Sequence, residues 1–328
     1  MTATSAPALS VVIVAPQRFE SVRKTIRKLR MQTIKDRLEI IVVVPSAGEV
    51  GVVESDLSGF FGYKIVEVGA IHSVDRAAAQ SIRSATAPVV ALIEDHAFPD
   101  ADWAELLVAA HQGSWAAVGP SIENANPASM MSWANLLMAY GQWGGTAAVD
   151  GTAIDDLPTH NVSYKRALLL EFGTDLENMI GRESSLHRNL RANGHKFFIE
   201  PKAKVYHLNP SRLFSTIALR FQAGRLFGAT RARHERWSAL RRLLYIGALP
   251  LIPAMHLPRI IREMRQSNRH RELMPRVLPA LVFGLTLSAL GEITGYAFGS
   301  GNTKHFLEHF ELDRLNHLTA SDKQAALA

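Results

Sequence analysis

The sequence contains no cysteine, and it also lacks several other features that would direct its interpretation. Without cysteine, disulfide bonds and thiolate metal sites are excluded, which suits a reducing compartment. The first residues, MTATSAPALS, lack the basic start and long apolar stretch of a signal peptide, and the run LSVVIVAP is too short to be one. The chain shows no internal repeat and no low-complexity tract. Composition therefore favours a folded protein without a leader.

One long part of the chain contains no lysine, and its basic residues are arginines. Between Ser211 and Arg276 there are fourteen arginines and three glutamates, a local charge of +11. Because the whole chain carries +6, the remainder carries −5. A basic segment next to apolar runs fits anionic lipid headgroups better than DNA, and no nucleic-acid motif accompanies it. We therefore expect a membrane with anionic lipids as a partner, and no nucleic acid.

Short apolar runs alternate with helical patterns over the first 120 residues. The runs are Leu9–Ala15, Leu38–Val44, Val89–Ile93, Ala116–Gly119 and a weaker Lys64–Val68. The expected helices are 21–32, 73–85 and 102–111. Apolar strands separated by helices indicate an α/β fold with a parallel sheet covered on both faces. With 328 residues, 47% of them hydrophobic, the chain can bury a large core.

The later part of the α/β region is less regular. The expected elements are a helix over 128–143, a loop over 144–158, a helix over 183–193 ended by Gly194, and short strands over 197–199 and 204–206. We expect the α/β domain to span 1–210, followed by arginine-rich and apolar helices over 211–300 and a tail over 301–328.

Two apolar runs lie in the C-terminal third. Leu243–Leu257 has fifteen residues and two prolines, whereas Val277–Phe298 has twenty-two. A straight membrane span needs about 20 apolar residues, so only the second run is long enough. Arginines flank the first run on both sides and favour the cytoplasmic side, which indicates a re-entrant or interface-lying segment. The alternative is a buried helical hairpin in a soluble protein.

The stretch VVALIEDHAFP runs from an apolar strand directly into Glu94, Asp95 and His96. Ligands of open α/β sheets bind just beyond the carboxyl ends of such strands. Two carboxylates and an imidazole there can hold a divalent cation, which would neutralise a phosphate-bearing substrate. The plainer alternative is that Asp95 caps a turn and His96 is a surface histidine.

Five segments, in order and spacing, resemble the family-2 glycosyltransferases over residues 8–210. They are SVVIVAP, LEIIVVV, Asp75-Arg76, EDHAFP, and THNVSYKR followed by GRESSLHRNLRANGHKFFIEPKAKVYH. The resemblance implies the GT-A fold, with a Rossmann-like, mostly parallel sheet, here followed by a membrane-associated helical region. It also implies an inverting, hexosyltransferase-type enzyme that uses a nucleotide-diphosphate sugar and a Mn or Mg ion.

The resemblance also implies roles for individual residues. The expected nucleotide-sugar contacts are Pro16, Asp75, Arg76, Glu94 and Asp95. The expected acceptor contacts are Asn161, Ser163 and Tyr164. The expected metal ligands are Asp95, His96 and His207. An imidazole ligand favours Mn over Mg. For His207, alone at a strand end, a structural role is the alternative, and Asp75 could simply favour a helix start.

Glu183 matches the general base of the family, which takes a proton from the acceptor hydroxyl. It is expected to open a helix, where an acidic residue is also favoured by the helix dipole alone. A carboxylate base must lie within hydrogen-bond reach of the hydroxyl, and partial desolvation would raise its basicity.

The chain departs from the family pattern at several positions. Val44-Pro45-Ser46 stands where an aspartate usually contacts the base of the nucleotide, and Arg182 replaces an acidic residue. The segments around Gln222 and Trp237 do not complete the Gln-x-x-Arg-Trp motif of processive synthases, which favours single addition.

The expected function is therefore transfer of one sugar to a lipid-linked or cell-envelope glycan at the inner membrane, with the catalytic domain cytoplasmic. A catalytically inactive scaffold in polysaccharide assembly is the alternative. A nucleotidyltransferase ranks below both, because Ala15-Pro16-Gln17-Arg18 offers no glycine-rich phosphate loop.

Overall fold

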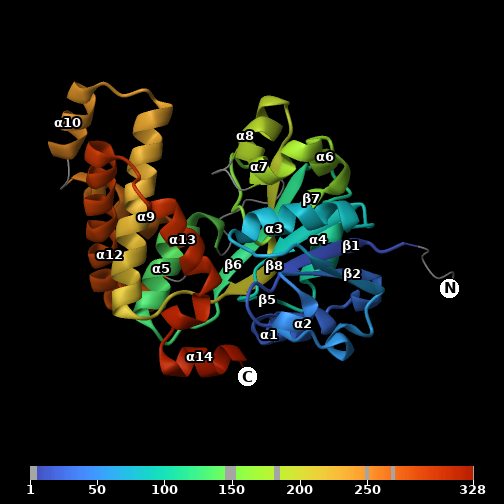
Figure 1. Ribbon diagram of the computed structural model, residues 1–328. Coiled ribbons are helices and arrows are strands. Elements are labelled where there is room, and N and C mark those ends of the chain that lie inside the picture. Colours follow the sequence, from blue (N-terminus) through green and yellow to red (C-terminus); the bar gives the residue numbers. More distant parts are fainter. Residues whose placement is uncertain (1–5, 145–152, 181–184, 248–250, 267–269, 328) are drawn as a thin grey trace. The chain divides into compact units, whose positions relative to one another are not determined.

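The computed structural model describes residues 6–144, 153–180, 185–247, 251–266 and 270–327 (Figure 1). The chain divides into two compact units. Unit 1 comprises residues 1–125, 145–207 and 326–328, and unit 2 comprises residues 126–144 and 208–325. The chain thus enters unit 2 twice, after residue 125 and again after residue 207. The domain boundaries expected at residues 210 and 300 remain predictions.

Unit 1 is built on an 8-stranded sheet with the order β3-β2-β1-β4-β7-β6-β8-β5. The strands are β1 Leu9–Val14, β2 Leu38–Val44, β3 Gly62–Glu67, β4 Val89–Ile93, β5 Ala97–Pro99, β6 Ala117–Asn124, β7 Val162–Lys165 and β8 Phe197–His207. β1, β2 and β4 are buried along their whole length, as parallel strands covered on both faces are. Four strand pairs are parallel and three, those of β7 and β5, are antiparallel. The expected α/β fold with a mostly parallel sheet is confirmed.

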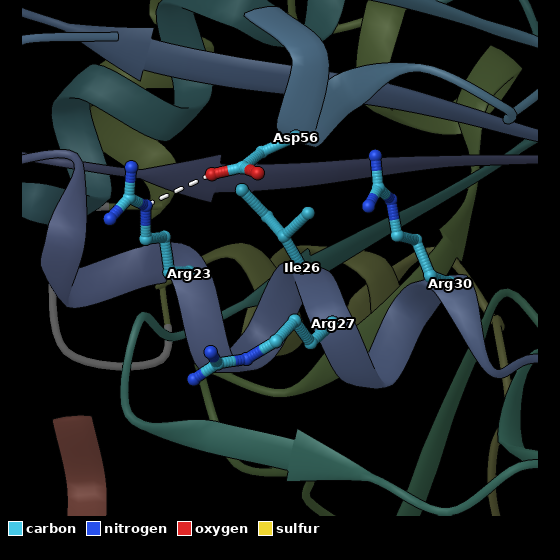
Figure 2. Close-up of a pocket in the computed structure, with 5 residues that line it drawn as sticks. All are labelled: Arg23, Ile26, Arg27, Arg30 and Asp56. Atoms are coloured by element: carbon cyan, nitrogen blue, oxygen red, sulfur yellow. Dashed lines mark hydrogen bonds and ion pairs between the residues drawn. The ribbon is translucent and has the colours of Figure 1, made fainter. Parts of the chain in front are cut away.

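The helices of unit 1 include an amphipathic first helix. They are α1 Glu20–Arg30, α2 Ala47–Val50, α3 Val74–Ser81, α4 Trp103–Ala110, α6 Arg166–Leu170, α7 Leu176–Ile180 and α8 Ser185–Ala192. α1 buries Ile26 at the floor of a groove of 310 Å³ that Arg23, Arg27 and Arg30 line (Figure 2). Arg23 Nε lies 2.9 Å from the carboxylate of Asp56. α1 thus buries its apolar face, and its arginines lie beside Ile26 at the rim of the groove.

Several expected elements differ in extent from those of the structure. The two short strands expected over 197–206 form the single strand β8, whose pairing with β6 shifts register between Pro120 and Ser121. The helix expected over 73–85 ends at Ser81 and continues as a short 3₁₀ turn. Gly194 has a φ of 82° after α8, as a helix-ending glycine does. Residues 301–328, expected as a tail, include two helices.

Unit 2 is helical in the part that the structure describes. Its helices are α5 Met130–Tyr140, α9 Leu213–His234, α10 Ala239–Gly247, α11 Leu251–Gln266, α12 His270–Phe298, α13 Thr303–Leu312 and most of α14 Ala320–Leu327. The first apolar run of the sequence thus falls on α10 and α11, and the second lies within α12.

Glycines allow α9 and α12 to approach each other closely. A Cβ added at Gly224 of α9 would lie 2.0 Å from the carbonyl oxygen of Ser288, and one at Gly291 of α12 would lie 2.0 Å from that of Phe221. Gly228 and Gly295 repeat the same contact one turn along, at 2.2 Å each. Such small-xxx-small spacing on facing helices is common in membrane helix pairs.

One helical segment among the described residues, Glu272–Phe298, is long and apolar enough to cross a bilayer, and 44% of its apolar 18-residue stretch is buried inside the protein. α10 and α11, bent by 67° across residues that lie outside the description, pass the same test only when taken together. Buried helices of soluble proteins can share this length and composition.

Candidate active site

Two antiparallel strand pairings bring distant residues together at the end of β4. Ala97 of β5 pairs with His207, the last residue of β8, so His96 lies beside His207. Leu92 of β4 pairs with Val162 of β7, so Asn161 lies beside the segment that follows β4. The polar residues after the central strand therefore meet residues far along the sequence.

Glu94, His96 and His207 form a buried cluster whose ligand atoms all lie within 4.8 Å of one another. His207 Nε2 lies 3.2 Å from Glu94 Oε2 and 3.2 Å from His96 Nε2. His96 Nε2 lies 3.8 Å from Glu94 Oε1. Each of the three residues is 6% exposed or less. One carboxylate and two imidazoles that converge in this way are suited to a divalent cation.

Asp95 lies behind the cluster. Its Oδ1 atom is 2.6 Å from His96 Nδ1. A carboxylate only accepts hydrogen bonds, so His96 Nδ1 donates to Asp95, and Nε2 is the ring nitrogen that faces Glu94 and His207. Such carboxylate–histidine pairs orient metal-binding imidazoles. The cluster thus contains Glu94, His96 and His207 of the expected ligands, and Asp95 contacts it through His96; its role as a metal ligand remains a prediction.

Asn161 fixes the Glu94 carboxylate. Its Nδ2 atom donates to Glu94 Oε2 at 2.6 Å, and its Oδ1 atom accepts from the Glu94 backbone N–H at 3.2 Å. Asn161 is fully buried and has a φ of 56°, a conformation that asparagine adopts more readily than most residues. Burial raises the pKa of Glu94, but the charges of His96, His207 and His160 outweigh burial, so this pKa lies well below its usual range.

Asp75 and Arg76 lie in the first turn of α3, as the sequence predicted for a helix start there. Asp75 Oδ1 is 3.3 Å from Nδ1 of His160, the residue next to Asn161, and so connects α3 to the cluster. Arg76 donates to Asn178 at 3.3 Å. Pro16 is half-buried, two residues beyond the end of β1.

Ser163 and Tyr164, expected on the acceptor side, are buried and hydrogen-bonded within unit 1. Ser163 Oγ donates to the Val118 carbonyl at 2.8 Å and lies 2.9 Å from Nε2 of His111. The Tyr164 hydroxyl lies 2.8 Å from Nε2 of His187 on α8. Burial raises the pKa of Tyr164 and lowers that of His111 to about 4. Their acceptor role remains a prediction.

Glu183, the expected base, and Arg182 lie outside the described residues. The nearest described element along the chain is α8, which begins at Ser185. His187 in its first turn lies 2.9 Å from Asp156 and 2.8 Å from Tyr164. Sequence reasoning missed His160 and His187, because a single histidine in a polar segment carries no pattern of its own.

No protein-family model matches the chain, and no curated protein matches it. Among solved structures, the mannosyltransferase PcManGT from Pyrobaculum calidifontis, in complex with GDP-Man and Mn²⁺, is similar with a TM-score of 0.51 and 16% identity, covering 99% of this chain and 86% of that one. S. aureus TarS is similar with a TM-score of 0.45 and 11% identity over 88% of this chain, which spans 55% of the length of that structure. The sheet and the similarity to PcManGT show that the chain has the GT-A fold.

Proposed function

We propose that the chain is a metal-dependent inverting glycosyltransferase that moves a single sugar from a nucleotide-diphosphate sugar to an acceptor hydroxyl. The observation that carries the proposal is the buried Glu94–His96–His207 cluster at the end of β4 in a GT-A fold. The PcManGT complex supports it, because that enzyme was solved with a nucleotide sugar and Mn²⁺.

Each part of the site has a role in this proposal. Glu94, His96 and His207 would hold the cation, Mn in preference to Mg because two of three ligands are imidazoles. A bound cation supplies charge compensation for the departing nucleotide diphosphate. Asp95 and Asn161 would orient His96 and Glu94 and so position the ligands.

Residues around the cluster would bind the two substrates. Pro16, Asp75 and Arg76 would contact the nucleotide sugar, and Asn161, Ser163 and Tyr164 would shape the acceptor side. Glu183 would take the proton from the acceptor hydroxyl as that oxygen attacks the anomeric carbon.

The acceptor would be a lipid-linked or cell-envelope glycan. The local charge of +11 between Ser211 and Arg276 and the apolar segment Glu272–Phe298 support a place at the inner membrane, with unit 1 on the cytoplasmic side.

Titration of the purified full chain with Mn²⁺ tests the metal site. His96→Ala and His207→Ala should each weaken Mn²⁺ binding by roughly a hundredfold, and Asp95→Asn by roughly tenfold, since residues that orient a ligand matter nearly as much as the ligand. His195→Ala, a half-buried histidine outside the cluster, is the matched control. Unchanged Mn²⁺ binding by the His96 and His207 variants would remove the basis of the proposal.

The second candidate is an inactive scaffold in polysaccharide assembly. It is favoured by the departures from the family pattern at Val44, Glu94, His96 and Arg182. A panel of nucleotide-diphosphate sugars separates the two candidates. An enzyme releases nucleotide diphosphate in a cation-dependent reaction, whereas a scaffold that binds Mn²⁺ releases none.

A further inference from the structure

α10 presents its apolar face to the outside of unit 2. Leu240, Leu243 and Leu244, spaced three and four residues apart on one face, are 69%, 64% and 66% exposed. No residue of α10 is buried. A helix that served only to cover the core of a soluble protein would turn these leucines inward.

The opposite face of α10 carries its arginines and tyrosine and packs on the protein. Tyr245 and Ile246 contact a buried cluster that contains Trp237 and Tyr296. The Arg241 guanidinium stacks 4.6 Å from the Trp237 ring and lies 2.9 Å from the Glu235 carboxylate. Aromatic stacking and an ion pair therefore hold the polar face of α10 on the protein. This leaves the leucine face available to a partner.

α11, the next helix along the chain, also exposes apolar side chains. Leu251 and Met255, one turn apart, are 59% and 75% exposed. The second half of the helix buries Ile260 and Met264 and exposes the arginines 259, 262 and 265, of which Arg259 lies 3.4 Å from Glu263. Of the exposed large apolar residues among those described, thirteen of sixteen belong to unit 2. The surface is thus apolar first and cationic next.

We propose that the outer face of α10 and the first half of α11 form a docking surface for a bilayer that contains anionic phospholipid. The five exposed residues Leu240, Leu243, Leu244, Leu251 and Met255 enter the acyl boundary, and the α11 arginines reach the headgroup phosphates. Charge complementarity selects lipid over a protein partner, because these arginines follow directly on the apolar surface. This inference rests on the proposed function, which it deepens by naming the membrane-binding surface.

Vesicle flotation with the purified full chain tests the docking surface. Wild type should float with vesicles of phosphatidylcholine and phosphatidylglycerol, and less with phosphatidylcholine alone. The triple variant Leu240→Ser, Leu243→Ser, Leu244→Ser should lose roughly a hundredfold in vesicle affinity, since three apolar side chains no longer enter the bilayer. Arg262→Gln with Arg265→Gln should reduce only the part that depends on phosphatidylglycerol and on low salt.

The matched control is Met31→Ser, an apolar residue of unit 1 that is 63% exposed, and it should float as wild type does. Far-UV circular dichroism of the triple variant verifies that unit 2 still folds. Unchanged flotation of the triple variant would overturn the proposal. So would a lipid-independent dimer that the triple variant dissociates, because the leucines would then bind a second copy.

Donor hydrolysis in detergent, without vesicles, separates this inference from the proposed function. A chain that floats but releases no nucleotide diphosphate overturns the enzyme and supports the docking surface. A chain that hydrolyses donor while the triple variant floats normally overturns the docking surface alone.

Discussion

α1 of unit 1 and α10 of unit 2 are both short amphipathic helices with arginines, yet they face their surroundings in opposite ways. α1 buries Ile26 and holds Arg23, Arg27 and Arg30 beside it at a surface groove (Figure 2). α10 holds its arginine and tyrosine face on the protein and exposes its leucines. The first arrangement is typical of a helix on the water-exposed surface of a protein.

The same contrast extends to the two units. In unit 1 the apolar strands are fully buried, and the buried polar groups at the end of β4 form one connected cluster. In unit 2, charged residues such as Arg220 and Glu292 are buried while large apolar side chains are exposed. We infer that unit 1 supplies the chemistry and unit 2 supplies the contact with lipid.

The largest expected effect concerns the chemistry of unit 1. Glu183→Gln keeps the size of the side chain but removes its basicity, so transfer should fall by roughly 10²–10⁴-fold. Donor binding, measured by calorimetry with a nucleotide-diphosphate sugar and Mn²⁺, should stay unchanged. Leu240→Ser is the control from unit 2 and should keep full turnover on a water-soluble acceptor. Full turnover of Glu183→Gln would show that another group is the base.

The next effect tests whether close helix packing stabilises unit 2. Gly291→Ala places a Cβ 2.0 Å from the Phe221 carbonyl oxygen, so α9 and α12 must separate, at a cost of about 3 kcal/mol. In unit 1, Gly48→Ala meets nothing within 4 Å, and because alanine favours a helix it should change stability by less than about 1 kcal/mol. Urea unfolding followed by circular dichroism compares the two. Equal effects would contradict the packing.

A smaller effect is expected for a buried carboxylate in the sheet of unit 1. Glu39 accepts hydrogen bonds from Lys64 Nζ and the Thr86 N–H, each at 2.8 Å, and from Ser10 Oγ. Burial raises the pKa of Glu39, but the hydrogen bonds from Lys64, Ser10 and Thr86 together outweigh burial, so this pKa lies below its usual 4.5. Glu39→Gln should lower the free energy of unfolding by about 1.5–3 kcal/mol at neutral pH, because the amide NH₂ group would face groups that are themselves hydrogen-bond donors.

The pH dependence of this effect follows from the lowered pKa. The pKa of Glu39 is lower in the folded protein than in the unfolded chain. The contribution of this carboxylate to stability is therefore complete above pH 4.5 and is lost as the pH falls through the folded-state pKa. The difference between wild type and Glu39→Gln should therefore shrink on acidification below pH 4.5, as urea unfolding at several pH values would show. Glu49→Gln, at an exposed position, is the control. A constant difference would mean that the Glu39 charge does not stabilise the sheet.

The sequence allowed the central strands to be predicted because β1, β2 and β4 are nearly continuous apolar runs. β8 was divided in two because Pro201 and charged residues interrupt it, and proline is rare inside strands. The sequence predicts a cation site among Glu94, Asp95, His96 and His207, and the structure brings Glu94, His96 and His207 together, with Asp95 in contact with His96. Which carboxylate faces the histidines depends on the turn after β4 and on the pairing of β5 with β8, and neither leaves a periodic signal.

The smallest expected effect returns to the groove on α1. Arg23 and Asp56 form an ion pair at 2.9 Å, with side chains 42% and 33% exposed (Figure 2). Exposed pairs contribute about 0.2–1 kcal/mol and are weakened by salt, so Arg23→Gln and Asp56→Asn should show a coupling free energy in this range at low salt. A double-mutant cycle in urea measures it. A coupling above about 2 kcal/mol would mean that the groove is shielded from water, and the contrast between a water-facing α1 and an apolar-facing α10 would then be wrong.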